Sequence, residues 1–195
     1  SQLRCFWKLG NSGIVNVIDT LEEHGIKVLE IDAESSFDGL SAIVNDSYPV
    51  IVLNKSFNSE RKRFTALHEL GHIIIPFRSS VTEKEEENLC SLFASEMLIE
   101  ESVFRSIFGE KRFRISYQEL YSIQMQYGIS CDAMMHKAKD CGIISEQHYT
   151  SYWIKKRKDP DFREKLDNSI YPKEESSRFI RLVYKALSCE LITIS

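Results

Sequence analysis

The segment RFTALHELGHIIIPF, residues 63–77, constrains the fold and the chemistry of this chain more than any other. His68 and His72 are four residues apart, so in a helix their imidazoles lie on one face and can reach one metal ion. Glu69 lies about 100° further round the helix, where it can approach a metal-bound water. The spacing therefore predicts a zinc site with a general base beside it.

The residues around this motif predict that it lies on a helix of about four turns. Asn58 or Ser59 can cap the start of the helix and Pro76 blocks its continuation, so residues 60–75 are expected to be helical. Gly71 costs about 1 kcal/mol inside a helix, which indicates that another backbone or a ligand approaches there. The alternative is a core helix whose two histidines are hydrogen-bonded without a metal.

A catalytic zinc binds three protein side chains and leaves a fourth position for water, so a third ligand must come from elsewhere. The segment TEKEEENLCSLFASEMLIEE, residues 82–101, is typical of an amphipathic helix. Glu87 opens its inner stripe and is the preferred ligand. Cys90, one turn later, is interpreted as packing, because a fourth protein ligand would close the site. The less favoured candidates are acids at the helix start: Glu83, Glu85 and Glu86.

The pattern of elements changes near residue 110, which predicts an α+β fold. Before this point helices alternate with short strands, and LSAIV (40–44) and PVIVLN (49–54) are expected to be neighbours in a small sheet. After this point nearly every segment is typical of a helix. We therefore expect two parts, residues 1–110 with the metal site and residues 111–195, which are mostly helical.

Two segments of the second part carry further expectations. Residues 115–144 contain a helix, a turn at Gly128 and a second helix capped by Ser130, which is the outline of a helix-turn-helix. Their charges are nearly balanced, so packing is favoured over contact with DNA. A final amphipathic helix is expected to bury the side formed by Phe179, Leu182, Val183, Ala186 and Leu187.

Composition restricts the remaining function classes. The net charge of -4 argues against a chain that binds nucleic acid through its overall charge. Five scattered cysteines without a C-x-x-C pair suit reduced thiols in the cytoplasm, and no apolar run is long enough for a membrane span. The sequence starts without Met, so we expect the chain to be part of a longer protein.

The segments PVIVLN, RKRFTALHELGH and ENLCSLFASEML, in this order and at these spacings, resemble the ImmA/IrrE family of metallopeptidases. The resemblance covers residues 13–100. It implies that His68, His72 and Glu87 bind zinc and that Glu69 is the general base. The chain departs from the family at two places: Cys90-Ser91 stands where Ala-Asn is usual, and Ile99-Glu100 where Met-Pro is usual.

The resemblance also implies a zincin-like peptidase domain, often followed by a helix-turn-helix-like portion. The protein substrate would be a regulator such as a transcriptional repressor, with Zn2+ as cofactor and Mn2+ or Fe2+ as other metals that these ligands can hold. The family occurs fused to XRE-type DNA-binding domains, so DNA would be reached only through a fused part or the helix-turn-helix-like segment. The alternative is a non-catalytic zincin-fold module that senses a ligand or docks a partner.

Two features of catalysis stay open at this level. An extended substrate could pair with an edge of the sheet, at either LSAIV or PVIVLN. Arg61, Arg63 and Tyr48 are weak candidates for stabilising the oxyanion, because each residue type more often serves surface or packing roles.

Overall fold

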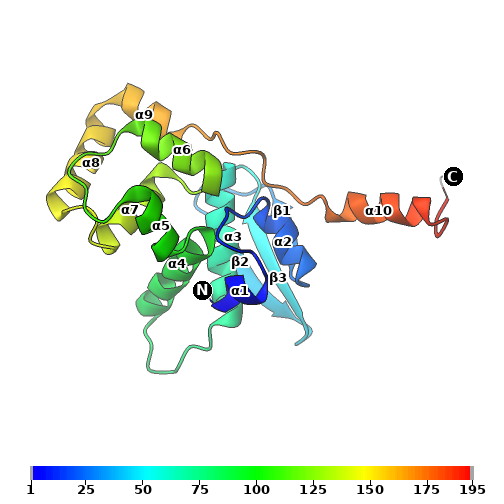
Figure 1. Ribbon diagram of the computed structural model, residues 1–195. Helices are drawn as coiled ribbons and strands as arrows, with labels where there is room; N and C mark the ends of the chain where they lie inside the picture. The colour runs from blue at the N-terminus through cyan, green and yellow to red at the C-terminus, as the bar shows by residue number, and fades with distance from the viewer. Residues whose placement is uncertain (1, 194–195) are drawn as a thin grey trace.

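The computed structural model describes residues 2–193, and these form the expected α+β fold around one small sheet (Figure 1). The sheet has the strands β1 (Lys27–Ile31), β2 (Gly39–Val44) and β3 (Tyr48–Asn54), in the order β1-β3-β2. β1 runs parallel to β3, whereas β2 pairs with β3 as an antiparallel hairpin. Asn45 and Asp46 turn the hairpin with φ values of 51° and 52°, a left-handed conformation that these residue types tolerate.

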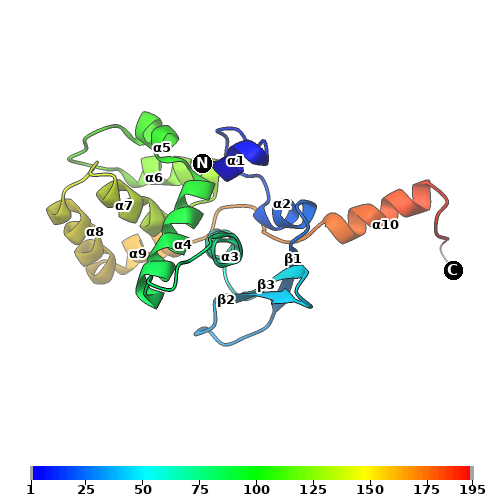
Figure 2. The same ribbon diagram turned by 90° about the horizontal axis from the view of Figure 1, so that it is seen from below.

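One face of the sheet is covered by α3 (Ser59–Ile74), the helix that carries the HELGH motif (Figure 2). Asn58 caps α3 by accepting a hydrogen bond from the Arg61 backbone N–H, and the helix ends just before Pro76. The expected helix over residues 60–75 is therefore confirmed to within one residue. Buried residues of α3, among them Leu67 and Leu70, form the core with the inner face of the sheet.

A second long helix, α4 (Glu83–Leu98), packs against α3. Thr82 and Glu85 form a capping box at its start, which fixes where the helix begins. Gly71 of α3 allows the close approach, because a Cβ built there would lie 3.0 Å from Cys90 Sγ and 3.2 Å from Cys90 Cα. The expectation that a backbone approaches Gly71 is confirmed, and the approaching backbone is α4.

α2 lies beside α3 and also contacts β1, whereas α5 to α9 lie on the side of α4 away from the sheet (Figures 1 and 2). α6 ends at Gly128, whose φ is +62°, and Ser130 caps α7, so the helix-turn-helix outline is confirmed. The bounds of these helices are α1 (Gln2–Phe6), α2 (Val17–Glu23), α5 (Glu101–Phe108), α6 (Tyr117–Tyr127), α7 (Cys131–Asp140), α8 (Glu146–Lys158) and α9 (Pro160–Asp167).

Arg63, in the second turn of α3, joins three distant parts of the chain to this helix. Its side chain is fully buried and donates hydrogen bonds to the carbonyl oxygens of Ile14 and Gly128, at 2.6 Å and 3.2 Å, and to the Glu174 carboxylate, at 2.8 Å. The segment before α2, the turn between α6 and α7, and the segment after α9 therefore all meet at α3.

The final helix, α10 (Arg178–Ser188), differs from its prediction. It extends away from the rest of the chain (Figure 1), and none of its residues is buried. Phe179 and Leu182 are 72% and 49% exposed, so the expected burial of this apolar side is wrong. Amphipathic periodicity indicates that a face can be buried, but the contact of α10 with α2 leaves every residue of this helix unburied.

The sheet face opposite α3 is open, with Leu29 and Leu40 at 55% and 45% exposure on either side of Val52. All five cysteines are free thiols. Among the described residues, no helix has both the length and the apolar character that crossing a membrane requires.

Candidate metal centre

Three predicted ligands lie together where α3 and α4 meet. The Nε2 atoms of His68 and His72 are 3.2 Å apart on the same face of α3. Glu87, in the second turn of α4, places Oε2 3.0 Å from His68 Nε2 and Oε1 3.3 Å from His72 Nε2. Donor atoms from two helices therefore converge on one point.

The spacing and chemistry of these donors fit zinc. Ligands bound at about 2.0–2.1 Å in a tetrahedral site lie about 3.3 Å from one another, which is close to the three separations found here. Two imidazoles and one carboxylate are also a donor set that catalytic zinc uses. The side chains of His68, His72 and Glu87 are 15%, 25% and 54% exposed, so the site opens to solvent.

The other acids of α4 lie outside this cluster. Glu85 accepts hydrogen bonds from the backbone and hydroxyl of Thr82, and these bonds lower the pKa of its carboxyl. It therefore caps the helix instead of facing α3. Within residues 2–193, neither Glu83 nor Glu86 belongs to a group of side chains that could share a metal ion.

Cys90 is a packing residue, as expected from the sequence. It is fully buried against Gly71 and is absent from the donor cluster of the described residues. Burial, followed by the negative charge of Glu87, raises the pKa of its thiol to about 11. The thiol is therefore neutral near pH 7, which disfavours it as a ligand in this position.

Ser91 adds a contact that the sequence reasoning missed. Its hydroxyl lies 3.3 Å from His68 Nδ1. When Nδ1 carries the proton and donates to Ser91, Nε2 keeps its lone pair for a metal. Ser91 follows Glu87 by four residues, so this i, i+4 spacing was the signal that could have identified it.

Glu69 is held separately from the three candidate ligands. It is 9% exposed, and its Oε2 accepts a hydrogen bond of 2.8 Å from the Ser41 hydroxyl on β2. Ser41 was also missed by the sequence reasoning, although its position in a strand beside α3 was a usable signal. The carboxylate of Glu69 is thus fixed by an edge strand of the sheet.

The weak candidates for oxyanion stabilisation are not supported. Arg63 is completely buried and bound to Glu174 and to backbone carbonyls, which excludes it as a group that stabilises the oxyanion. Arg61 pairs with Asp38 at 2.6 Å, and Tyr48 is an exposed residue at the start of β3. The structure brings none of the three to the donor cluster.

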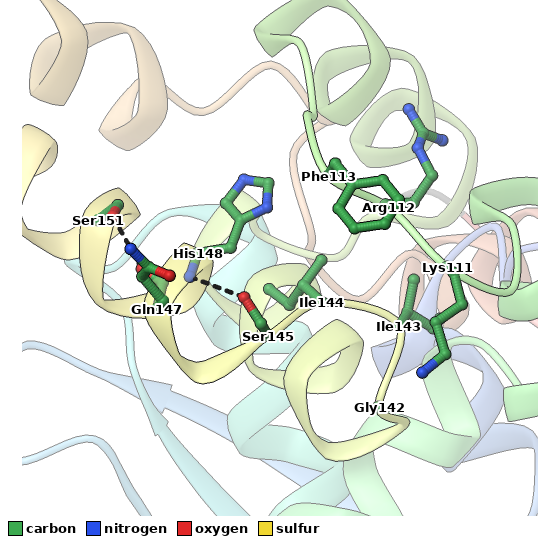
Figure 3. A pocket seen from close by; sticks show the side chains of 10 residues that line it. All are labelled: Lys111, Arg112, Phe113, Gly142, Ile143, Ile144, Ser145, Gln147, His148 and Ser151. Atoms are coloured by element: carbon green, nitrogen blue, oxygen red, sulfur yellow. Dashed lines mark hydrogen bonds between the residues drawn. The ribbon is translucent and has the colours of Figure 1, made fainter.

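Two of the hollows on the surface of the described residues differ in their relation to the metal centre. One, of about 680 Å3, is formed by residues 111–113 and the start of α8 and contains none of the candidate ligands (Figure 3). At its edge Ser145 Oγ accepts a hydrogen bond from the backbone N–H of His148 (Figure 3). The second, of about 1190 Å3, reaches Ser91 and hence adjoins the metal centre.

Comparison with known proteins identifies a family for this arrangement. The model of a peptidase family, described as the IrrE N-terminal-like domain, matches residues 21–139, which are 119 of the 195 residues. The match includes α3, α4 and the α6–α7 pair. No curated protein matches the chain.

Proposed function

Because the chain belongs to the peptidase family of the IrrE N-terminal-like domain, we propose that it is a zinc-dependent metallopeptidase that cleaves a regulatory protein. The observation that supports this proposal most is the convergence of His68, His72 and Glu87 on one point. A peptidase family and a donor set suited to catalytic zinc agree with each other. A cytoplasmic location and a repressor as substrate are further parts of the proposal.

In this proposal His68, His72 and Glu87 hold the zinc and Glu69 is the general base. Zinc bound there would lower the pKa of a water molecule and polarise the peptide carbonyl. Glu69 takes the proton of the attacking water and gives it to the leaving nitrogen. Ser41 donates to one oxygen of Glu69, which fixes the carboxylate and leaves its other oxygen for this proton transfer.

The strand order favours one of the two strands considered for substrate binding. β3 is the central strand and pairs on both sides, so PVIVLN has no free edge. β2 is an edge strand, and Ser41 on β2 contacts Glu69 directly. We therefore propose that an extended substrate pairs with β2, because added strands bind through free backbone groups at a sheet edge.

The test combines metal analysis with Glu69→Gln. We expect the unmodified protein and Glu69→Gln both to retain about one zinc per chain, while Glu69→Gln cleaves a candidate repressor at least about a hundredfold more slowly. His72→Ala should lose the zinc, whereas Glu86→Gln, next to Glu87 but outside the cluster, should keep both zinc and activity. A protein that binds zinc but cleaves no partner would favour a non-catalytic sensing or docking module.

A further inference from the structure

The hollow that adjoins the metal centre is a groove with two walls. α3 and α4 supply one wall, and α7 with the end of α9 supplies the other. It reaches the metal centre at Phe64, Asn88 and Ser91, and Ser91 contacts His68. Lys137 of α7 binds Glu96 of α4, which holds the two walls together. A peptide bound at the metal centre can therefore continue into this groove.

Negative charge predominates along the groove. Arg61 and Lys137 are the cations among its described lining residues. The carboxylates are Glu60, Glu96, Glu101, Asp132, Asp140 and Asp167. Even when Lys156 and Arg105, which pair with some of these acids, are included, six carboxylates stand against four cations. Arg61 is moreover paired with Asp38, which lies outside the groove.

Two of these carboxylates occupy positions that helix stability does not explain. Asp140 is the last residue of α7 and Asp167 is the last residue of α9. A carboxylate at a helix C-terminus is unfavourable, because the helix dipole is negative there. Among the described residues Asp140 takes part in no ion pair, and Asp167 shares Lys156 with Asp132. Both acids therefore add to the negative potential in the groove.

The groove also offers apolar surface between its acids. Leu92 is 56% exposed on α4, and Phe64 lies close to the His68 ring at 6.4 Å between ring centroids. Leu166 lies in the opposite wall, where it is 5% exposed. Lysine and arginine side chains combine an apolar stem with a cationic end, so a groove with apolar patches and acidic groups fits them.

We propose that this groove binds a basic segment of the protein substrate, next to the bond that the metal centre cleaves. This inference rests on the proposed peptidase function and adds a substrate class to it. Asp140 and Asp167 determine the preference for lysine and arginine, and the same charges repel the phosphates of nucleic acid. The substrate would pass along β2 and Glu69 and enter the groove beside Ser91.

Binding can be tested separately from cleavage. The probes are fluorescein-labelled decapeptides of alanine with four lysines or, in the matched peptide, four glutamates. Zinc-loaded Glu69→Gln protein should bind the lysine peptide at least about tenfold more tightly, as fluorescence anisotropy measures, and added salt should weaken this binding. The double variant Asp140→Asn/Asp167→Asn should lose most of the difference. Equal affinities for the two peptides would overturn the proposal.

Two controls make the outcome specific to the groove. Glu190→Gln, which removes an exposed acid just after α10, should leave the affinity unchanged, and an equal loss in this variant would refute a local effect. Asp140→Asn should fold with unchanged or higher thermal stability, so weaker binding could not be ascribed to unfolding. Asp167→Asn leaves Lys156 its pair with Asp132.

Cleavage and peptide binding, measured together, distinguish a failure of the groove proposal from a failure of the peptidase proposal. If the unmodified protein cleaves peptides without a preference for basic ones, the groove proposal is wrong and the peptidase proposal stands. If it cleaves no peptide while Glu69→Gln still binds the lysine peptide selectively, the peptidase proposal is wrong, and only the preference of the groove for basic peptides stands. For an active enzyme, Asp140→Asn should raise KM for a basic substrate and leave kcat nearly unchanged.

Discussion

Two serine hydroxyls fix the groups to which we assign chemistry. Ser91 contacts the Nδ1 atom of His68, and Ser41 donates to the carboxylate of Glu69. Neither serine belongs to the HELGH motif, and each comes from a different element that packs on α3. Contacts of this kind orient a ligand or a base, and their loss weakens a site without removing any ligand.

At the residue scale we predict that Ser91→Ala lowers zinc affinity by about tenfold or more, because His68 loses the contact that sets its ring orientation. Ser91→Asn, which restores the residue usual in the resembling family, should retain affinity because its amide oxygen can accept from Nδ1–H. Competition with a chromogenic zinc chelator measures both. Ser95→Ala, one turn further along α4, is the control, and equal affinities in all variants would contradict the assigned role.

At the scale of elements, the segment after α9 stabilises the start of α3. Residues 168–177, here called the strap, cross this helix end. Glu60 accepts hydrogen bonds from the Ser169 hydroxyl and from two strap backbone N–H groups, and Glu174 binds Arg63. Glu174 also accepts a bond of 2.9 Å from the backbone N–H of Ile18 in α2. The helix that carries the HELGH motif is thus connected to both ends of the chain.

We predict that Arg63→Met lowers the free energy of unfolding by about 3–5 kcal/mol, because Glu174 would remain charged and buried without its partner. Arg61→Met is the matched control. Its pair with Asp38 is about half exposed, and exposed pairs contribute at most about 1 kcal/mol. Urea unfolding gives both values. The double variant Arg63→Met/Glu174→Gln should recover part of the loss, and similar losses for the two single variants would contradict this account.

At the scale of the whole molecule, the described chain leaves two apolar surfaces uncovered. One is the sheet face opposite α3, and the other is the apolar side of α10. α10 is joined to α2 mainly through exposed polar contacts, including Arg181 with Glu23 at 3.2 Å. Large uncovered apolar surfaces are uncommon on folded chains. The contacts of the metal centre do not depend on either surface.

We therefore predict unequal effects of two C-terminal truncations. Removal of residues 178–195 should change the free energy of unfolding by less than about 1 kcal/mol, because no residue of α10 is buried and its ion pairs are exposed. Removal of residues 168–195 also deletes the strap and should cost several kcal/mol, since Arg63 loses Glu174. Urea unfolding of the two truncated proteins tests this, and equal losses would show that α10 is part of the core.

The division of the chain at residue 110 stays a prediction, and contacts cross it. The Gln124 side chain donates to Glu60 at 2.7 Å, and Arg63 reaches Gly128. The family match also continues to residue 139.

DNA contact by α6 and α7 likewise stays a prediction, which the charges of α7 do not favour. Lys137 is buried in its pair with Glu96, and the accessible end of the helix carries Asp140.

The sequence by itself determined the local features of the site. A cap at Asn58 or Ser59, Pro76 and the four-residue histidine spacing define one helix, because they act through hydrogen bonds and periodicity within a few residues. The preference for Glu87 came from the apolar stripe of the next helix, and Gly71 indicated a close neighbour. These signals are local, so they can be read without knowing the fold.

Only the tertiary structure decided which distant elements meet. It showed that Ser41 donates a hydrogen bond to Glu69 and that Ser91 contacts His68. It also showed that Arg63 forms a buried ion pair with Glu174, and that β2 lies at an edge of the sheet. It also showed that α10 is left unburied, contrary to its periodicity. Each of these depends on contacts between residues far apart in sequence, where a partner, or its absence, decides what a side chain does.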